Sequence, residues 1–559
     1  MSSFDKEGLY FAALGGAEEV GYNMYVYAVD GKLIVVDCGY GFLNDDFPGM
    51  ELGFASPEAL ESEIENIEGL FITHSHEDHF GAVAHIWPKL RCPIYATPFA
   101  AAHVVSRLKD YKLEKEPQIN IVRNGESVRL QNFEVRFASL VHSTLENSAL
   151  LIRTRYGNAV HATDWRFDDG SCGMLPTDYE ALKAFAEEGV EVFACDSTNL
   201  LDSEEQPTEM QIRASLMELV PTFQNKLVAT CFASNVVRLE SLILAAHAAG
   251  RTPVIAGMSL NQNLNMAKEC GYLQNLPPYV NAKDAVDIPN DKIMYICAGS
   301  QGNYRSGLTR IVNRENKDMI LCPGDAVIFS SKIIPGNEKK IERMQEKLRD
   351  QGVQVISKEE YLVHCSGHGG KEETRRMYEL LKPNVLIAVH GERRVIREHS
   401  RFAKSCGIRH VVMPRNGDVL LLNGDSVETV GEVPTDILGV DRNQITSVNS
   451  QLVKNRKRIA YNSSVFITAM LKADWQVEDL QISSIDILEE TAWDELSAAI
   501  KEDMLKSIPE EVIKLNYREN AVKEYISAKI RKKIYNATGI KPVVFMHFYK
   551  EAEPAAPQE

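Results

Sequence analysis

Apolar runs that end close to a histidine or an aspartate recur along the N-terminal part of the chain. The runs 24–29 and 33–36 are separated by Asp30-Gly31, and this pattern predicts a β-hairpin whose second strand ends at Asp37. Further predicted strands that end near a candidate ligand are 69–72, 133–138, 157–162 and 192–195. Because the ends of successive strands lie along one rim of a sheet, we expect these polar side chains to meet.

A regular alternation of strands and helices fills residues 206–357. The pair Ser234-Asn235 predicts the start of a helix that runs to Ala249. Strands are predicted at 227–232, 253–256, 293–297 and 326–330, with later helices at 261–269 and 337–350. This alternation predicts an α/β layer with a mostly parallel sheet.

The strand-then-histidine pattern returns after this alternation. An apolar strand at 385–389 ends at His390, so the alternation is predicted as an insertion within one domain. Periodicity is then lost, and residues 429–455 are predicted as a linker. Residues 456–550 show the strand and helix signals of a small α+β domain, and residues 551–559 are predicted as a disordered tail.

The composition is that of a globular chain with several domains. With 559 residues the chain is too long for a single domain with one hydrophobic core. Of these residues 44% are apolar and 25% are charged. No apolar run reaches the length of a membrane span, and no export signal is visible, so no membrane partner is expected. The ten cysteines form no C-x-x-C pair, which favours reduced core cysteines and the cytoplasm.

The formal net charge of −17 argues against a protein that coats nucleic acid through bulk basicity. It does not exclude a nuclease, because bound divalent ions and a locally basic groove can attract phosphate.

The densest candidate site directly follows the strand 69–72. Within six residues it holds four candidate metal ligands: His74, His76, Asp78 and His79. Imidazole together with carboxylate suits zinc, and two such groups of ligands suit two zinc ions. The alternative is a solvated histidine-rich turn.

Candidates at single strand ends are weaker signals. Asp37 is either an exposed strand end or a carboxylate that orients a metal-bound histidine. A lone histidine such as His142 is more often structural than a ligand. Asp164 and Asp196 each end another apolar strand, and His368 either caps its helix or takes part in chemistry.

The series Asp37, the histidine cluster, His142 and Asp164 resembles the motifs of the metallo-β-lactamase fold. Nearly the whole chain resembles the β-CASP branch of the metallo-β-lactamase nucleases, and within it the bacterial ribonuclease J family. The motifs that carry this second resemblance are Gly15-Gly16 with Glu19-x-Gly21-x-Asn23-Met24, Asp196-Ser197-Thr198-Asn199, Phe232-Ala233-Ser234-Asn235, Gly299-Ser300-Gln301-Gly302, Ile334-Pro335-Gly336-Asn337-Glu338, Ser366-Gly367-His368-Gly369, Val389-His390-Gly391-Glu392 and Pro414-Arg415-Asn416-Gly417.

The resemblance implies a fold in the α/β class. A metallo-β-lactamase αββα sandwich would comprise residues 1–205 and 358–428, and a β-CASP α/β domain would be inserted at 206–357. The C-terminal domain at 456–550 resembles one often linked with dimerisation.

The resemblance also implies a metal site with two zinc ions per subunit. One zinc would take His74, His76 and His142, the other would take Asp78, His79 and His390, and Asp164 would bridge them. A hydroxide activated by the two metals would attack the phosphodiester. Mn²⁺ in place of zinc, and an added structural Ca²⁺, remain open.

The implied catalytic residues are Asp78, His368 and Asp196. Asp78 would orient the hydroxide, and His368 would stabilise or protonate the leaving 3′ oxygen. Asp196 would orient an active-site histidine, and Asp37 would support a metal-bound one.

The activity implied by the resemblance is that of a ribonuclease that degrades RNA from its 5′ end, prefers a 5′ monophosphate and also cleaves internally. It would act in RNA decay and in rRNA and mRNA maturation. The substrate's terminal nucleotide would be held by Ser234, Asn235, Ser300, Gln301, Gly302, His364, Cys365, Ser366, Gly367 and His368. A homodimer or homotetramer is expected, with further partners possible in an RNA-degradation complex.

Other readings remain open. A DNA-directed β-CASP nuclease would share these motifs, whereas a small-molecule metallohydrolase would need neither the insertion nor the pair Asp196 and His368. A non-catalytic RNA-binding scaffold usually lacks ligands that are all present here. The mild departures from the family pattern are Glu18, Glu146, Thr163 and Asn303.

Overall fold

The computed structural model describes residues 4, 7–44, 46–111, 113, 115–168, 172–202, 206–285, 287–303, 306–316, 319–334, 337–424, 426–442, 444–472 and 474–550. The predicted disordered tail at 551–559 lies outside these described residues. The chain divides into two compact units. The first comprises Met1–Phe42 and Gly53–Asp436, and the second comprises Leu43–Leu52 and Ile437–Glu559.

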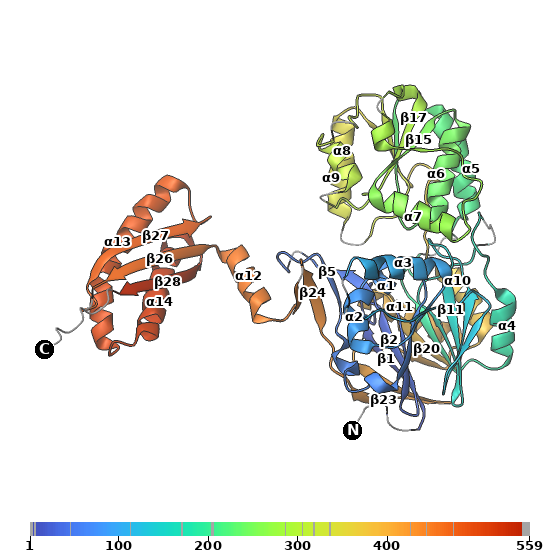
Figure 1. Cartoon of the computed structure of the whole chain (residues 1–559), viewed down its shortest axis with the longest axis horizontal. Coiled ribbons are helices and arrows are strands. Elements are labelled where there is room, and N and C mark those ends of the chain that lie inside the picture. Colours follow the sequence, from blue (N-terminus) through green and yellow to red (C-terminus); the bar gives the residue numbers. More distant parts are fainter. Residues whose placement is uncertain are drawn as a thin grey trace. The chain divides into compact units, whose positions relative to one another are not determined.

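Two sheets face each other in the first unit (Figure 1). Within the described residues, one sheet has eight strands in the order β23-β22-β1-β2-β3-β6-β7-β8 and the other has seven in the order β21-β20-β13-β12-β11-β10-β9. The strands of the first are β1 Leu9–Gly15, β2 Met24–Val29, β3 Lys32–Val36, β6 Ile67–Ile72, β7 Ile94–Ala96, β8 Ile119–Ile121, β22 Asp418–Asn423 and β23 Ser426–Glu432. Those of the second are β9 Ser127–Arg129, β10 Glu134–Ser139, β11 Ser148–Thr154, β12 Gly157–Ala162, β13 Val192–Asp196, β20 Val385–Val389 and β21 His410–Val412.

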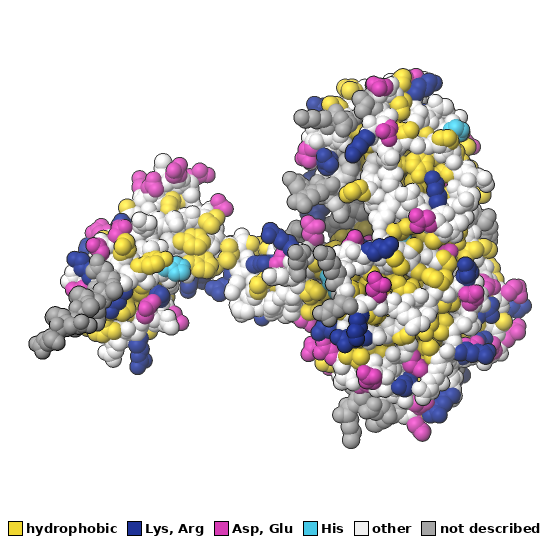
Figure 2. Space-filling view, in the orientation of Figure 1, with side chains coloured by type: hydrophobic (Ala, Val, Ile, Leu, Met, Phe, Trp, Pro, Cys, Tyr) yellow, Lys and Arg dark blue, Asp and Glu magenta, His cyan; other side chains and the backbone are white. Residues whose placement is uncertain are grey.

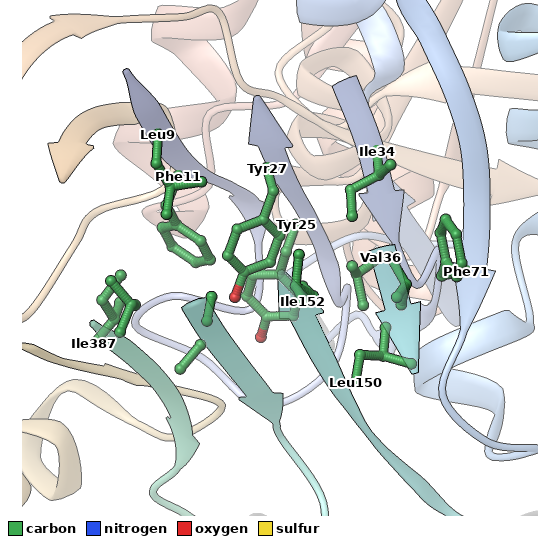
Figure 3. Packing of buried hydrophobic residues seen from close by; sticks show 14 of the residues in the cluster. Leu9, Phe11, Tyr25, Tyr27, Ile34, Val36, Phe71, Leu150, Ile152 and Ile387 are labelled. Atoms are coloured by element: carbon green, nitrogen blue, oxygen red, sulfur yellow. The ribbon is translucent and has the colours of Figure 1, made fainter. Parts of the chain in front are cut away.

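The space between the sheets is filled by apolar side chains from alternate positions of each strand. Phe11, Tyr27 and Val36 come from the first sheet and meet Ile152 and Ile387 from the second (Figure 3). Burial of these apolar side chains makes the largest favourable contribution to the free energy of folding of the sandwich.

Helices cover the outer faces of both sheets. Beside the first sheet lie α1 Glu77–Phe80, α2 Val83–Leu90 and α3 Pro98–Lys109, and over the second lie α4 Tyr179–Glu187, α10 Lys371–Leu381 and α11 Arg393–Ser405. Shorter elements of this unit are β4 Tyr40–Phe42, η1 Pro57–Leu60, η2 Ile64–Asn66 and all but the first residue of β5 Leu52–Ala55. The layers confirm the predicted αββα sandwich.

The predicted insertion is an α/β layer with a parallel sheet in the order β16-β15-β17-β14-β18-β19. Its strands are β14 Leu227–Thr230, β15 Thr252–Ala256, β16 Val280–Asn281, β17 Ile293–Cys297, β18 Ala326–Phe329 and β19 Gln354–Ile356. Its helices are α5 Glu209–Leu219, η3 Val220–Thr222, α6 Val236–Ala248, α7 Met258–Glu269, η4 Ala282–Asp284, η5 Asn290–Lys292, α8 Gly307–Val312 and α9 Glu338–Asp350. The expectation of a parallel sheet is confirmed.

A buried ion pair joins the first two helices of the insertion. Arg238 of α6 donates to both carboxylate oxygens of Glu209 of α5 at 2.9–3.1 Å. The same guanidinium donates to the carbonyl oxygens of Ser330 and Val363. Arg238 is fully buried, so these bonds fix the chain just before His364 against the inserted domain.

The second unit has a three-stranded sheet in the order β27-β26-β28, covered on one face by two helices. Its elements are β24 Ile437–Asp441, β25 Gln444–Ser447, α12 Gln451–Asn462, β26 Ser464–Leu471, β27 Val477–Ile485, α13 Glu490–Lys514, α14 Glu519–Thr538 and β28 Val543–Lys550. The predicted α+β character of this part is therefore confirmed.

Two local expectations for this region are wrong. The stretch 429–455, predicted as an irregular linker, includes parts of β23 and α12 as well as the β24–β25 hairpin. The second concerns the helices, which the sequence predicts at 492–505 and 509–535, whereas α13 continues through Pro509 to Lys514. The chain turns instead at Asn516 and Tyr517, which both have left-handed backbone angles.

No helix within the described part of the chain is long and apolar enough to cross a membrane.

Replacing Arg238 by Leu is expected to destabilise the inserted domain by about 3–5 kcal/mol, because Glu209 would stay buried without its partner. Hydrogen exchange of the domain would measure the loss. Arg213→Ala is the matched control, since Arg213 pairs with Glu240 across the same two helices but at a more exposed position, and about 0–1 kcal/mol is expected. Equal effects of the two changes would contradict the role given to the buried pair.

Candidate metal centre

Strand ends bring the predicted ligands to one rim of the sandwich. His74 follows β6, His142 follows β10, Asp164 follows β12 and His390 follows β20. Asp196 is the last residue of β13, and it lies opposite Val389 in the parallel pair with β20. The short α1 adds Asp78 and His79 in its first turn.

A first group of ligand atoms comprises His74, His76, His142 and Asp164. Nε2 of His142 lies 3.0 Å from Nδ1 of His76 and 3.2 Å from Oδ2 of Asp164. Nε2 of His74 lies 3.8 Å from the same carboxylate oxygen. Ligand atoms about 2.1 Å from a tetrahedral zinc lie roughly 3.4 Å apart, so these separations suit one ion.

A second group comprises Asp78, His79 and His390. Oδ2 of Asp78 lies 3.6 Å from Nε2 of His79 and 3.4 Å from Nε2 of His390. The other oxygen of Asp164, Oδ1, lies 3.0 Å from Nε2 of His79. Each oxygen of Asp164 thus faces one group, which is the arrangement that a bridging carboxylate needs.

The three imidazoles of the first group are neutral. Burial lowers the pKa of His76 to about 4, and it holds the pKa values of His74 and His142 well below the usual range. Neutral imidazole is the form that binds a metal ion, so their lone pairs are available.

The second group has the opposite electrostatics. Burial opposes protonation of His390, but Asp164, Asp196 and Asp78 outweigh it and raise its pKa to about 10. Burial likewise opposes charge on His79, and the same kind of carboxylate surroundings raises its pKa well above the usual range. Protons therefore compensate the carboxylates when no metal is bound, and divalent cations would replace those protons.

Unpaired buried atoms support a metal site. Within the described residues, Nε2 of His74 and Oδ1 of Asp164 are buried without a hydrogen-bond partner, although His79 lies close to the latter. Such groups are costly unless something binds them. The donor set of imidazole and carboxylate fits divalent zinc or manganese.

Outer contacts orient the ligand imidazoles. Nδ1 of His142 donates to the carbonyl oxygen of Gly367 at 2.6 Å, so Nε2 carries the lone pair. Nδ1 of His79 lies 2.7 Å from Oδ2 of Asp37, which is fully buried and also accepts from Thr73. Carboxylate and carbonyl partners of this kind fix the tautomer of a metal-bound histidine.

His368 lies beside both groups. Its Nδ1 is 2.6 Å from Oδ2 of Asp196, and its Nε2 is 3.8 Å from Oδ2 of Asp164. Burial opposes its protonation, but Asp196 and Asp164 raise its pKa. Asn199 holds the loop by donating to the carbonyl oxygen of His368 and to the hydroxyl of Ser366.

The residues predicted to hold the terminal nucleotide are only partly free to do so. Asn235 caps α6, where its side chain accepts from the amide of Arg238. Gln301 is buried and bonds to the backbone of Lys332 and Ile334. The remaining predicted positions lie in turns or loops: Ser234, Ser300, Gly302, His364, Cys365, Ser366 and Gly367. Contact of any of them with a nucleotide stays a prediction.

Several residues support the site in roles that were not predicted from the sequence. Thr198 lies 3.0 Å from Nδ1 of His390 and donates to its carbonyl oxygen, and the stretch after Asp196 could have indicated it. Arg238 and Glu209 have no such signal, because their pairing depends on how two helices pack. The departure Glu146 has a structural role, since it accepts from the amide of Phe99 and from Tyr272.

The family comparisons fit this geometry. The description "metallo-beta-lactamase superfamily" matches residues 17–167, "ribonuclease J, beta-CASP domain" matches residues 224–348, and "Zn-dependent metallo-hydrolase RNA specificity domain" matches residues 336–414. The fold and the site therefore define a metallo-hydrolase of the β-CASP nuclease class.

Relatives that match most of the chain show the family to which it belongs. Ribonuclease J of Sinorhizobium meliloti is 33% identical over 97% of this chain and 98% of its own length. Ribonuclease J 1 of Streptococcus pyogenes is 30% identical over 83% of each chain, and ribonuclease J of Helicobacter pylori is 28% identical over 98% of this chain and 80% of its own. The chain belongs to the bacterial ribonuclease J family, and it is a nuclease that acts on RNA.

A solved structure supports the fold alone. The crystal structure of a protein of unknown function from Enterococcus faecalis V583 superposes with a TM-score of 0.53 at 15% identity, covering 74% of this chain and 100% of that one.

Zinc is expected to raise the thermal midpoint of the metal-free protein, because it binds the folded site and not the unfolded chain. The gain is about 2.7 kcal/mol at a hundredfold excess over Kd. His76→Ala should lose most of this gain, whereas His247→Ala, at an exposed position of α6, should keep it. Differential scanning calorimetry measures both. A His76→Ala protein that zinc stabilises as much as the parent would contradict the ligand set.

Proposed function

We propose that the chain is a zinc-dependent ribonuclease that degrades RNA from the 5′ end, prefers a 5′ monophosphate and also cleaves internally. The observation that carries the proposal is the pair of ligand groups on either side of Asp164. Two divalent ions held by these groups would suit phosphodiester hydrolysis. The role would be RNA decay and rRNA and mRNA maturation in the cytoplasm, by a homodimer or homotetramer with possible degradation-complex partners.

Seven residues of this chain would hold the two ions. His74, His76 and His142 would hold one, Asp78, His79 and His390 would hold the other, and Asp164 would contact both. When bound, the ions would lower the pKa of water and neutralise charge on the attacked phosphate. Asp78, whose carboxylate faces the site, would orient the attacking water.

His368 would deliver a proton to the leaving 3′ oxygen. It is held by Asp196 at 2.6 Å, and its Nε2 points toward the edge of the ligand cluster. A protonated imidazole in that position is suited to act as a general acid. Asp196 would keep Nδ1 protonated and the ring oriented, and it would thus act through His368.

A 5′ phosphate would find a donor and positive charge near His364. Arg238 donates to Nδ1 of His364 at 3.4 Å, so Nε2 carries the proton, and within the described residues that atom has no partner. Burial, with Arg238, Lys358 and Lys332 nearby, keeps the pKa of His364 well below its usual range. A neutral donor among cations is suited to an anion.

Purified protein should release mononucleotides from 5′-monophosphorylated RNA faster than from the same RNA with a 5′ triphosphate. The reason is that a single phosphate would accept a hydrogen bond from Nε2 of His364, whereas a triphosphate would add bulk and charge there. Product chromatography over time measures this. Equal rates would contradict the end preference, and a DNA strand cut in preference to RNA would favour the DNA-directed alternative.

The changes His368→Ala and His76→Ala are expected to differ in metal content. His368→Ala should lower kcat by about 10²–10⁴ and keep two zinc ions per chain, because general acid catalysis is lost while the ligands remain. His76→Ala should lose both hydrolysis and zinc. Elemental analysis of the assayed samples separates the two. Loss of zinc from His368→Ala would instead make His368 a ligand.

A further inference from the structure

The sheet of the second unit has two different faces. Alternate residues of β26, such as Val465 and Ile467, point into the core that α13 and α14 cover. The residues between them form the opposite face, whose rows run across β27, β26 and β28 in register. These rows are Ile485–Ser464–Val543, Ser483–Phe466–Phe545, Gln481–Thr468–His547 and Asp479–Met470–Tyr549. We refer to these residues as the open face.

An aromatic pair lies at the centre of the open face. The rings of Phe466 and Phe545 are stacked, with centroids 5.1 Å apart and planes 11° from parallel. Phe466 is 38% exposed, and further along the same strands Met470 is 47% and Tyr549 63% exposed. Figure 2 shows hydrophobic side chains gathered over the strands of this unit. The stack covers one face of each ring, and the other face is where a planar group would stack at the sheet surface.

Polar side chains flank the aromatic pair in the neighbouring positions. Ser483 lies beside Phe466, and the next row holds Gln481, Thr468 and His547. These groups donate and accept hydrogen bonds. A protein interface usually buries an apolar centre, whereas single-stranded RNA presents flat bases with polar edges. The open face combines aromatic rings with amide, hydroxyl and imidazole groups. This mixture matches single-stranded RNA better than it matches a protein partner.

A basic helix leads directly into the open face. α12 carries Lys454, Arg456, Lys457 and Arg458 and no acidic residue. It packs beside β28, and Ser463, which follows it, accepts from the amide of Val543 at 3.1 Å. Lys454 and Arg458 are exposed, whereas the other two pair with Asp441 and Asp46. This local positive charge stands out in a chain of net charge −17 and complements a phosphate backbone.

We propose that the open face binds single-stranded RNA by stacking bases on Phe466 and Phe545, with the phosphates beside α12. Stacking on exposed aromatic rings and a positively charged track together bind single strands with little sequence preference. The proposal rests on the proposed function in one respect, namely that RNA is the ligand. The face would hold the body of a long substrate, whereas the metal centre acts at the scissile bond.

The test is a double variant of the full chain, Phe466→Leu with Phe545→Leu. Leucine keeps an apolar surface but removes the flat rings, so it separates base stacking from apolar packing. Phe466→Tyr with Phe545→Tyr keeps the rings and serves as the conservative variant. Tyr525→Leu removes an exposed aromatic ring from α14 in the helical layer and is the matched control. Anisotropy with a long phosphorothioate RNA, which slows hydrolysis, measures affinity.

The leucine variant should bind the long RNA about tenfold more weakly, whereas the tyrosine variant and Tyr525→Leu should bind like the parent. Hydrolysis of a 5′-monophosphorylated dinucleotide should be unchanged in all of them. Parental affinity in the leucine variant would overturn the proposal. So would a leucine variant that loses self-association in sedimentation and keeps its RNA affinity, because the open face would then be a subunit interface.

If the leucine variant does not fold, cross-linking of RNA to the parent protein tests the same proposal. Single-stranded RNA with 4-thiouridine, irradiated with the parent protein, should attach to peptides of β26 and β28. Cross-links confined to the first unit would overturn the proposal. A parent protein that binds RNA through these strands but does not cut it would refute the proposed function and leave this inference standing.

Discussion

Buried negative charge at the rim of the sandwich is the constraint on which the rest of the site depends. Asp164 and Asp196 are almost completely buried, and Asp78 lies in the same cluster of ligand groups. Burial of a carboxylate costs several kcal/mol unless an opposite charge or a metal compensates it. The carboxylates outweigh the effect of burial and raise the pKa values of His79 and His390, so both imidazoles supply that charge in their protonated form when no metal is bound. Bound divalent ions would replace these protons. The buried carboxylates, which require positive charge nearby, therefore also favour metal binding.

The layers around this centre hold the charged groups in place. Asp37, Thr198 and the carbonyl oxygen of Gly367 each fix one imidazole tautomer, and all come from strand ends or from the loop after the insertion. The insertion contributes through the buried pair of Arg238 and Glu209, which fixes the chain that leads to His368. The chemistry of the sandwich and the packing of the inserted domain are therefore coupled through one short loop.

The sequence was sufficient for most of the fold and for the proximity of the predicted ligands. Strand periodicity followed by His74, His142 or Asp164 is a local signal, and parallel strands then bring such residues to one rim. The contact of Arg238 with Glu209 was not predictable, because it depends on the angle between two helices. The stretch 429–455 was predicted wrongly as a linker because β24 and β25 are short and half-exposed, so the alternation of apolar residues is weak there. Helix α13 continues through Pro509 because burial of Ile508 and Val512, on either side of it, in the core of the second unit outweighs a local preference.

The most direct measurement is anomalous diffraction at the zinc edge from crystals of the zinc-loaded protein. Two peaks per chain are expected, one among His74, His76 and His142 and the other among Asp78, His79 and His390, with Asp164 between them. A single peak, or peaks away from these residues, would contradict this expectation.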